Sequence, residues 1–268
     1  KVACGQCRGC RLSNARETAL RCVHEATSWW RNSFLTLTYD DEHLPEGGDL
    51  VVGDWQKFVK RLRKRGEKFK YLHVGEYGDL NRRPHFHACM FGVDWRDEQS
   101  ILLRQGKYPL WTHPELEEVW GQGHVAVGHL TFESAAYVAR YCMKKRSTPH
   151  DEVSTQMYDA AYERVDPDTG ECWHVRREYT TRSNGIGKEW FEKYHDDVYP
   201  DDEVIQAGKR FKPPRYYDKQ LDPAFLEGIK KRRQERAAEH AANNTWERLR
   251  VRERIAENRA KLHEHRKV

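Results

Sequence analysis

The chain has 268 residues, 33% of them charged, and its 47 lysines and arginines outnumber 42 aspartates and glutamates, for a formal net charge of +5. That length suits one substantial domain with extensions, and the basic balance favours nucleic acid as a partner over a membrane surface. No apolar run approaches the roughly 20 residues of a membrane-spanning helix, and no signal segment opens the chain. The composition therefore predicts a soluble intracellular protein without a membrane partner.

The chain begins with a Cys-rich segment, residues 1–30, which holds four of the seven cysteines. An odd, clustered set of cysteines favours metal binding or reduced thiols over a disulfide framework. Cys4, Cys7 and Cys10 follow at Cys-x-x-Cys spacing, and Cys22 is a fourth candidate, which fits the ligand loops of a structural Zn²⁺ site. An iron–sulfur cluster and a set of reduced cysteines that pack a helix are the alternatives.

Periodicity predicts the elements that follow. Residues 34–39 alternate apolar residues with threonine, as a half-buried strand does. A helix comes next, with Asp54 as its N-cap and Gly66 as its stop, and its basic face is either solvated or in contact with phosphates. Residues 69–77 and the run from Arg82 to Gly92 are predicted as two strands of a hairpin.

His85 and His87 lie on the second strand of that hairpin, two residues apart, so both imidazoles share one face. An isolated His-x-His is more often structural, and a ligand role needs a third group. Pairing of the two strands brings Glu76 near the histidines, and two imidazoles with a carboxylate can hold Mg²⁺ or Mn²⁺. Strand alternation puts Glu76 on the face of neighbouring apolar residues, so without a bulge it is expected toward the core. His73 is a weaker alternative ligand.

After an irregular insertion at 93–123 with a short helix near 115–120, a strand is predicted at 124–130 and a helix from Thr131. Tyr137 and Tyr141 are four residues apart on that helix, so both phenols share one face, which Lys144 continues. The commoner explanation is an aromatic stripe buried against a sheet, although a buried stripe does not require lysines. If a metal polarises a phosphodiester, a phenol can attack phosphorus and leave a phosphotyrosine and a free 3′-hydroxyl.

Several motifs occur in order and cover the chain to about Lys219. They are Cys4-Gly-Gln-Cys-Arg-Gly-Cys-Arg, Phe34-Leu-Thr-Leu-Thr-Tyr-Asp-Asp-Glu-His-Leu-Pro, Gly75-Glu-Tyr-Gly-Asp-Leu, Arg83-Pro-His-Phe-His-Ala-Cys, Ser134-Ala-Ala-Tyr-Val-Ala-Arg-Tyr, Gly185-Ile-Gly-Lys and Lys212-Pro-Pro-Arg-Tyr-Tyr-Asp-Lys. Together they resemble the replication initiators of microviruses, in the gokushovirus-like branch of the HUH endonuclease superfamily.

The resemblance implies an α+β HUH endonuclease fold, with a central five-stranded antiparallel sheet flanked by helices, over residues 31–217. Residues 218–268 would form a charged helical C-terminal extension. It also implies a two-tyrosine rolling-circle initiator, which nicks single-stranded DNA at the phage replication origin, forms a 5′-phosphotyrosine adduct and later rejoins the circle. The expected setting is the host bacterial cytoplasm, with the host replication machinery as a further partner.

By position, the resemblance gives His85 and His87 the metal role, with Glu76 as third ligand. Tyr137 and Tyr141 take the nucleophile roles, and Lys144 or Lys145 takes the role of the catalytic lysine. Two other functions stay open at this point. One is a zinc-stabilised protein that binds nucleic acid without catalysis, and the other is a related HUH relaxase or transposase.

The remaining basic residues suggest contacts with DNA, and the candidates are Arg82, Arg83, Arg182 and Lys188. The backbone amides of Gly185–Gly187 could hold a phosphate at a helix start, although a plain turn before that helix is the commoner structure. Two strands are expected around a turn at 166–170. Tyr216 and Tyr217 are expected to pack rather than to react, and residues from Asp222 onward are predicted as one or two long helices.

Overall fold

The computed structural model describes residues 5, 7–78, 81–144 and 160–265. The chain divides into two compact units, one of residues 18–190 and one of residues 1–17 with 191–268. The predicted domain boundaries at residues 30 and 217 do not coincide with these divisions and stay predictions. Within the described part of the chain, every helix is too short or too polar to cross a membrane.

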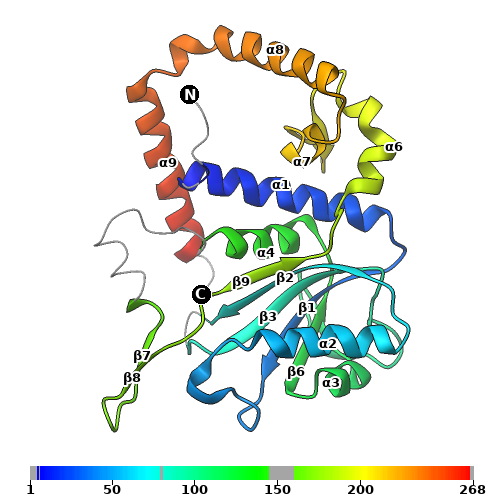
Figure 1. Cartoon of the computed structure of the whole chain (residues 1–268), viewed down its shortest axis with the longest axis vertical. Helices are drawn as coiled ribbons and strands as arrows, with labels where there is room; N and C mark the ends of the chain where they lie inside the picture. Colours follow the sequence, from blue (N-terminus) through cyan, green and yellow to red (C-terminus); the bar gives the residue numbers. More distant parts are fainter. Residues whose placement is uncertain (1–4, 6, 79–80, 145–159, 266–268) are drawn as a thin grey trace. The chain divides into compact units, whose positions relative to one another are not determined.

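The first unit is built on a seven-stranded antiparallel sheet with the strand order β4-β5-β6-β1-β3-β2-β9 (Figure 1). The α+β class and the antiparallel pairing are as predicted, but the predicted number of five strands is wrong. The two additional strands come from the insertion at 93–123, whose strands are too short for their alternation to stand out from the surrounding sequence. The strands of this sheet are β1 (Asn32–Tyr39), β2 (Lys70–Tyr77), β3 (Pro84–Phe91), β4 (Ile101–Arg104), β5 (Leu110–Thr112), β6 (Gly123–Gly128) and β9 (Tyr179–Arg182).

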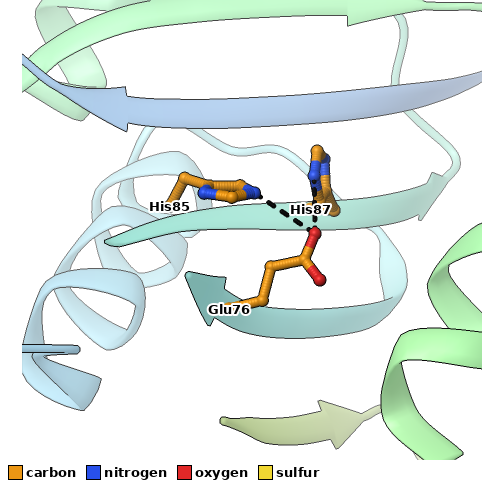
Figure 2. A group of neighbouring side chains, drawn as sticks. All are labelled: Glu76, His85 and His87. Carbon is orange, nitrogen blue, oxygen red and sulfur yellow. Dashed lines mark hydrogen bonds and ion pairs between the residues drawn. The ribbon is translucent and has the colours of Figure 1, made fainter. Parts of the chain in front are cut away.

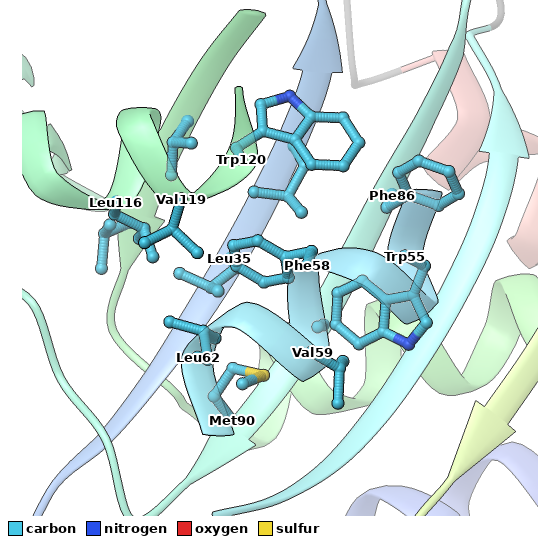
Figure 3. Close-up of a cluster of buried hydrophobic side chains, with 14 of the residues drawn as sticks. Leu35, Trp55, Phe58, Val59, Leu62, Phe86, Met90, Leu116, Val119 and Trp120 are labelled. Atoms are coloured by element: carbon cyan, nitrogen blue, oxygen red, sulfur yellow. The ribbon is translucent and has the colours of Figure 1, made fainter. Parts of the chain in front are cut away.

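Helices cover both faces of this sheet, so that the unit has two apolar cores. The first core lies under α2 and α3 and joins their aromatic and aliphatic residues to Phe86 and Leu35 of the central strands (Figure 3). The second core lies under α1 and α4, where Ala135 and Val138 pack on Leu72. The helices of the chain are α1 (Arg8–Thr27), α2 (Val52–Lys64), α3 (Pro114–Trp120), α4 (Phe132–Lys144), α6 (Lys188–Val198), α7 (Arg215–Asp218), α8 (Pro223–Glu239) and α9 (Trp246–His265).

Helix α2 shows how polar side chains fasten the first core. Its N-cap is Val51, not the predicted Asp54. Asp54 lies one turn inside the helix, where its carboxylate accepts a hydrogen bond of 3.0 Å from the hydroxyl of buried Tyr39. On the basic face, Arg61 donates to the carbonyl oxygens of Val119 and Trp120 at the end of α3. At least this arginine of the face therefore serves packing, since it satisfies carbonyls that a helix end leaves without partners.

The second unit contains helices from both ends of the chain and a small hairpin, β10 (Val204–Gln206) with β11 (Lys209–Phe211). Arg233 of α8 binds the carboxylates of Asp202 and Asp218, and Asp218 also accepts from the hydroxyl of buried Tyr199. Tyr217 is fully buried and stacks on Phe191, as the prediction of a packed tyrosine pair requires. The C-terminal residues form two helices, α8 and α9, in agreement with the prediction.

Two further strands, β7 (Glu163–Val165) and β8 (Cys172–His174), form the predicted hairpin around the turn at 166–170. Asp166 closes this turn by accepting hydrogen bonds from the backbone amides of Asp168 and Thr169. The Trp173 indole donates to the carbonyl oxygen of Gly47, which holds the hairpin on the first unit. One-turn 3-10 helices at Glu46–Gly48 and Ala241–Asn243 complete the described elements.

Candidate metal centre and nucleophile

The two histidines of β3 and the glutamate of β2 converge on one point (Figure 2). The strands pair in the predicted antiparallel hairpin, with Glu76 opposite His85 and Val74 opposite His87. Nε2 of His85 lies 3.2 Å from Glu76 Oε1, and Nε2 of His87 lies 3.0 Å from the same oxygen. One ligand atom from each side chain lies within 4.8 Å of the others, which is close enough for a single metal ion to bind all of them.

Glu76 reaches the histidines without a bulge. It shares a strand face with Leu72 and Val74, as the alternation of side chains requires, and this face carries the second core. The second core ends before Glu76 and gives way to the two imidazoles. Side-chain alternation thus placed Glu76 correctly, and the expected conflict between core and site does not arise, because both faces of the sheet are covered.

Hydrogen bonds on the far side of each imidazole orient its Nε2. His85 Nδ1 lies 3.1 Å from the carbonyl oxygen of Arg83, which can only accept, so Nδ1 carries a proton. In the neutral ring, Nε2 then points a lone pair at the Glu76 carboxylate, and a cation between these atoms satisfies both. His87 Nδ1 lies 2.9 Å from the hydroxyl oxygen of Thr36. Sequence reasoning missed Thr36, although the threonines that alternate along residues 34–39 were a usable signal.

Burial and charge prepare these groups for a cation. Glu76 is only 1% exposed, and its Oε2 is buried without a hydrogen-bond partner among the described residues. Burial by itself would raise the pKa of Glu76, but the hydrogen bonds from His85 and His87 outweigh it and lower that pKa. Burial also lowers the pKa of His87. A deprotonated carboxylate beside a neutral imidazole is the form that binds metal, so the residues fit a divalent ion.

Tyr137 of α4 adds a phenol to this centre. Its hydroxyl donates to Glu76 Oε1 over 3.4 Å, and its ring meets the His87 imidazole edge-on, with centroids 5.2 Å apart. The helix begins at a reciprocal cap, in which the hydroxyl of Thr131 accepts from the amide of Ser134 and the hydroxyl of Ser134 accepts from the amide of Thr131. This cap sets where α4 starts and therefore which of its turns faces the histidines.

The other residues predicted on this helix lie at its end. Tyr141 and Lys144 belong to the last turn of α4, but their side chains lie outside the described residues, as does Lys145 as a whole. Their roles as second nucleophile and as catalytic lysine stay predictions. The structure therefore brings one of the two predicted tyrosines to the candidate metal ligands.

The predicted DNA-contact residues are distributed around the sheet. Arg83 donates to the carbonyl oxygen of Tyr39 and pairs with Asp41 at 2.7 Å, and Arg82 donates to the carbonyl oxygen of Ala161. Arg182 and Lys188 are exposed at the end of β9 and at the start of α6. Contact of these residues with DNA stays a prediction.

The loop Gly185–Gly187 is a turn, as the commoner of the two interpretations held. The Gly187 amide donates to the carboxylate of buried Glu25 over 2.7 Å, and Arg21 donates twice to the carbonyl oxygen of Ile186. A carboxylate of the chain itself thus occupies the anion position at this amide. Sequence reasoning missed Glu25, because nothing in the run of α1 marks a buried acid.

Two predicted ligands lie away from one another or from the site. Cys22 is buried in the second core, and continuous helix α1 separates it from Cys10 by about 18 Å at a rise of 1.5 Å per residue. One zinc ion, with Zn–S bonds of about 2.3 Å, cannot bind both, so Cys22 has to be removed from the predicted set. Cys4 lies outside the described residues, and a site with Cys7 stays a prediction. His73 lies on the opposite sheet face, where it stacks on Trp55 with centroids 3.9 Å apart.

Comparison with known proteins gives the family of the chain. Residues 32–146 match the family model of the replication-associated protein ORF2. The chain is 34% identical to replication-associated protein VP4 of Bdellovibrio phage phiMH2K, over 80% of this chain and 65% of that protein. It is 33% identical to replication-associated protein ORF2 of Spiroplasma virus 4, over 87% of this chain and 73% of that protein.

A third relative, replication-associated protein ORF4 of Chlamydia phage 1, is 31% identical over 86% of this chain and 58% of that protein. The chain thus spans less than two thirds of the length of the phiMH2K and Chlamydia phage proteins. No solved structure matches it. From the identity and coverage shared with the Spiroplasma virus protein, we conclude that the chain belongs to the family of replication-associated proteins of microvirus-like phages.

Proposed function

We propose that the chain is a DNA nicking and joining endonuclease of the HUH class, which starts rolling-circle replication by cutting one strand at the phage origin. The observation that carries the proposal is the convergence of His85, His87 and Glu76 with the Tyr137 hydroxyl. Replication-associated names among the relatives support the role in replication. The conversion of an origin into a primer requires a cut that keeps the bond energy of the phosphodiester.

In the proposed reaction, the Tyr137 oxygen attacks the phosphorus of the scissile phosphodiester. The bond from phosphorus to the 3′-oxygen breaks, the phenol loses its proton, and the 3′-oxygen takes up a proton to become the 3′-hydroxyl that a polymerase can extend. The 5′-phosphate stays on the tyrosine. Attack of the 3′-hydroxyl on this phosphotyrosine reverses the step and closes the circle without an outside energy source.

The chain contributes position and charge to this step. A divalent ion, Mn²⁺ or Mg²⁺, bound by the histidines and Glu76 would supply positive charge next to the phosphate oxygens. Glu76 Oε1 accepts from the phenol and holds it beside the imidazoles. Tyr141 follows one turn later on α4 and is the proposed second nucleophile, which lets the first adduct persist during a second cut.

The test is formation of a covalent adduct with labelled single-stranded oligonucleotides that tile the genome encoding the chain, in the presence of Mn²⁺. We expect a band that survives denaturing electrophoresis and a DNA-linked tyrosine in α4 by mass spectrometry. Tyr137→Phe with Tyr141→Phe should abolish the band, while Tyr216→Phe in the second unit serves as the matched control. An adduct of undiminished yield in the double variant would show that another residue is the nucleophile.

The metal ligands are tested separately from the nucleophile. We expect His85→Ala or His87→Ala to reduce cleavage below detection and to leave the affinity for single-stranded DNA nearly unchanged, because phosphate contacts supply most non-specific affinity. Cleavage is followed with the oligonucleotide that forms the adduct, and affinity by fluorescence anisotropy. If affinity falls in parallel with cleavage, the histidines hold the DNA or the fold, and the catalytic assignment is wrong.

A further inference from the structure

The outer edge of the sheet carries apolar side chains that no other part of the described chain covers. Strand β4 is the first strand in the sheet order, and its neighbour β5 pairs with one side of it only. Ile101, Leu102 and Leu103 follow one another along β4, with 56%, 50% and 55% of their surfaces exposed. Tyr108, in the turn to β5, is also exposed. Together they form the β4 edge patch.

An edge strand of this composition is unusual for a surface that meets only water. The free side of an edge strand presents backbone amides and carbonyls, and soluble proteins usually protect it with charged side chains or proline. None of the residues Ile101–Leu103 is charged, and the exposed apolar residues are consecutive, so they lie on both sides of the strand. Such a patch indicates an interface with another chain.

The order of charges around β4 indicates which chain this is. The acidic residue Glu98 precedes the patch, and Lys107 follows it at the same distance from the midpoint between Leu102 and Leu103. When two copies of this strand run antiparallel around that midpoint, Leu102 of each copy meets Leu103 of the other. Glu98 of each copy then lies opposite Lys107 of the other. Neither Glu98 nor Lys107 has an ion-pair partner elsewhere among the described residues.

We propose that the β4 edge patch pairs with the same patch of a second copy of this chain, in an antiparallel dimer around a twofold axis. Such an interface is self-complementary and closes after two copies. The register of β4 on β5 shifts between Leu102 and Arg104, which is a β-bulge. A bulge bends the strand and limits how far backbone pairing extends, so side-chain packing and the Glu98–Lys107 pairs supply the specificity.

The first experiment measures the mass of the full-length chain by sedimentation velocity over a range of micromolar concentrations. We expect the wild-type chain to pass from monomer to dimer, and Leu102→Lys to stay a monomer with an unchanged circular dichroism spectrum, since the side chain is half exposed. A wild-type chain that stays a monomer at all concentrations, or a Leu102→Lys chain that dimerises as well as wild type, would overturn the proposal.

The second experiment tests the register by reversing charges. Glu98→Lys and Lys107→Glu each put like charges opposite one another, so each variant alone should weaken the dimer at least tenfold. An equimolar mixture of the two variants restores both opposite-charge pairs across one interface, and it should dimerise as the wild type does. A mixture that stays monomeric overturns the antiparallel pairing, and so does a single reversal without effect.

Discussion

At the scale of single residues, the site depends on groups that hold the ligands as much as on the ligands. His85 and His87 lie on one strand face, but Nε2 of each can point at Glu76 only when the other ring nitrogen is fixed. The carbonyl oxygen of Arg83 does this for His85, and the hydroxyl of Thr36 does it for His87. Such groups orient the imidazole, and their loss usually weakens metal binding without destroying the site.

Replacement of Thr36 tests this arrangement. Thr36→Val keeps the shape and β propensity of the residue but removes the partner of His87 Nδ1, so we expect the affinity for Mn²⁺ to fall by roughly tenfold. Titration calorimetry measures the affinity. Thr38→Val, two residues along the same strand and bonded to a backbone carbonyl instead of a ligand, should bind Mn²⁺ as the wild type does. Equal affinities in all three proteins would show that Thr36 does not orient the ligand.

At the scale of elements, α1 is fastened to the sheet by a buried carboxylate. Glu25 is fully buried and pairs with Lys70 of β2 at 2.9 Å. It also accepts from the Trp29 indole and from the amide of Gly187, both over 2.7 Å. One side chain therefore joins a helix, a strand and the turn that leads into α6. A buried charge that has all of these partners stabilises the fold, but it becomes costly when a partner is lost.

Neutralisation of this carboxylate should be costly as well. Glu25→Gln keeps the shape of the side chain but replaces charge-assisted hydrogen bonds and leaves the Lys70 ammonium without its buried partner. We expect the free energy of unfolding in urea to fall by about 2 kcal/mol. The exposed Glu118→Gln, which removes only a surface pair with Arg65, should change it by less than about 0.5 kcal/mol. A Glu25→Gln variant as stable as the wild type would contradict a fastening role.

At the scale of the whole molecule, buried neutral imidazoles couple stability to pH. His24 stacks on Trp190 with centroids 3.5 Å apart, and burial lowers its pKa to about 3. Burial also lowers the pKa of His73 well below its ordinary value. Below about pH 6.5 the unfolded chain binds protons at these histidines and the folded chain does not, so stability falls as the pH falls. Above that pH, both states are neutral there and the effect vanishes.

We therefore expect His24→Phe to flatten this pH dependence. The variant keeps an aromatic ring against Trp190 but cannot take up a proton in the unfolded state. Between about pH 6 and pH 4, its free energy of unfolding should fall less steeply than that of the wild type, by about 1.4 kcal/mol per pH unit. His124→Phe, at an exposed position of β6, should leave the slope unchanged. Urea unfolding at several pH values gives the slopes, and parallel curves for His24→Phe and wild type would contradict a neutral buried His24.

The residue sequence alone determined the periodic elements of the first unit and the composition of its site. Alternation along residues 34–39 and 69–77 and the His-x-His spacing of β3 depend only on neighbouring residues, so strands, hairpin and shared histidine face could be predicted. The spacing of Tyr137 likewise predicted its helix, whose start the cap at Thr131 confirms. Strand pairing then brought Glu76 to the histidines as expected.

Only the tertiary structure decided the features that depend on contacts between distant residues. Short strands such as β4 and β5 carry too few residues for a period to emerge, and pairing with β6 creates them. Asp54 resembles a helix cap in sequence, but the hydroxyl of Tyr39 draws it into the core. Cys22 resembles a zinc ligand, but helix α1 carries it into an apolar cluster. Local patterns specify secondary structure and candidate chemistry, whereas burial and partners follow from how the elements pack.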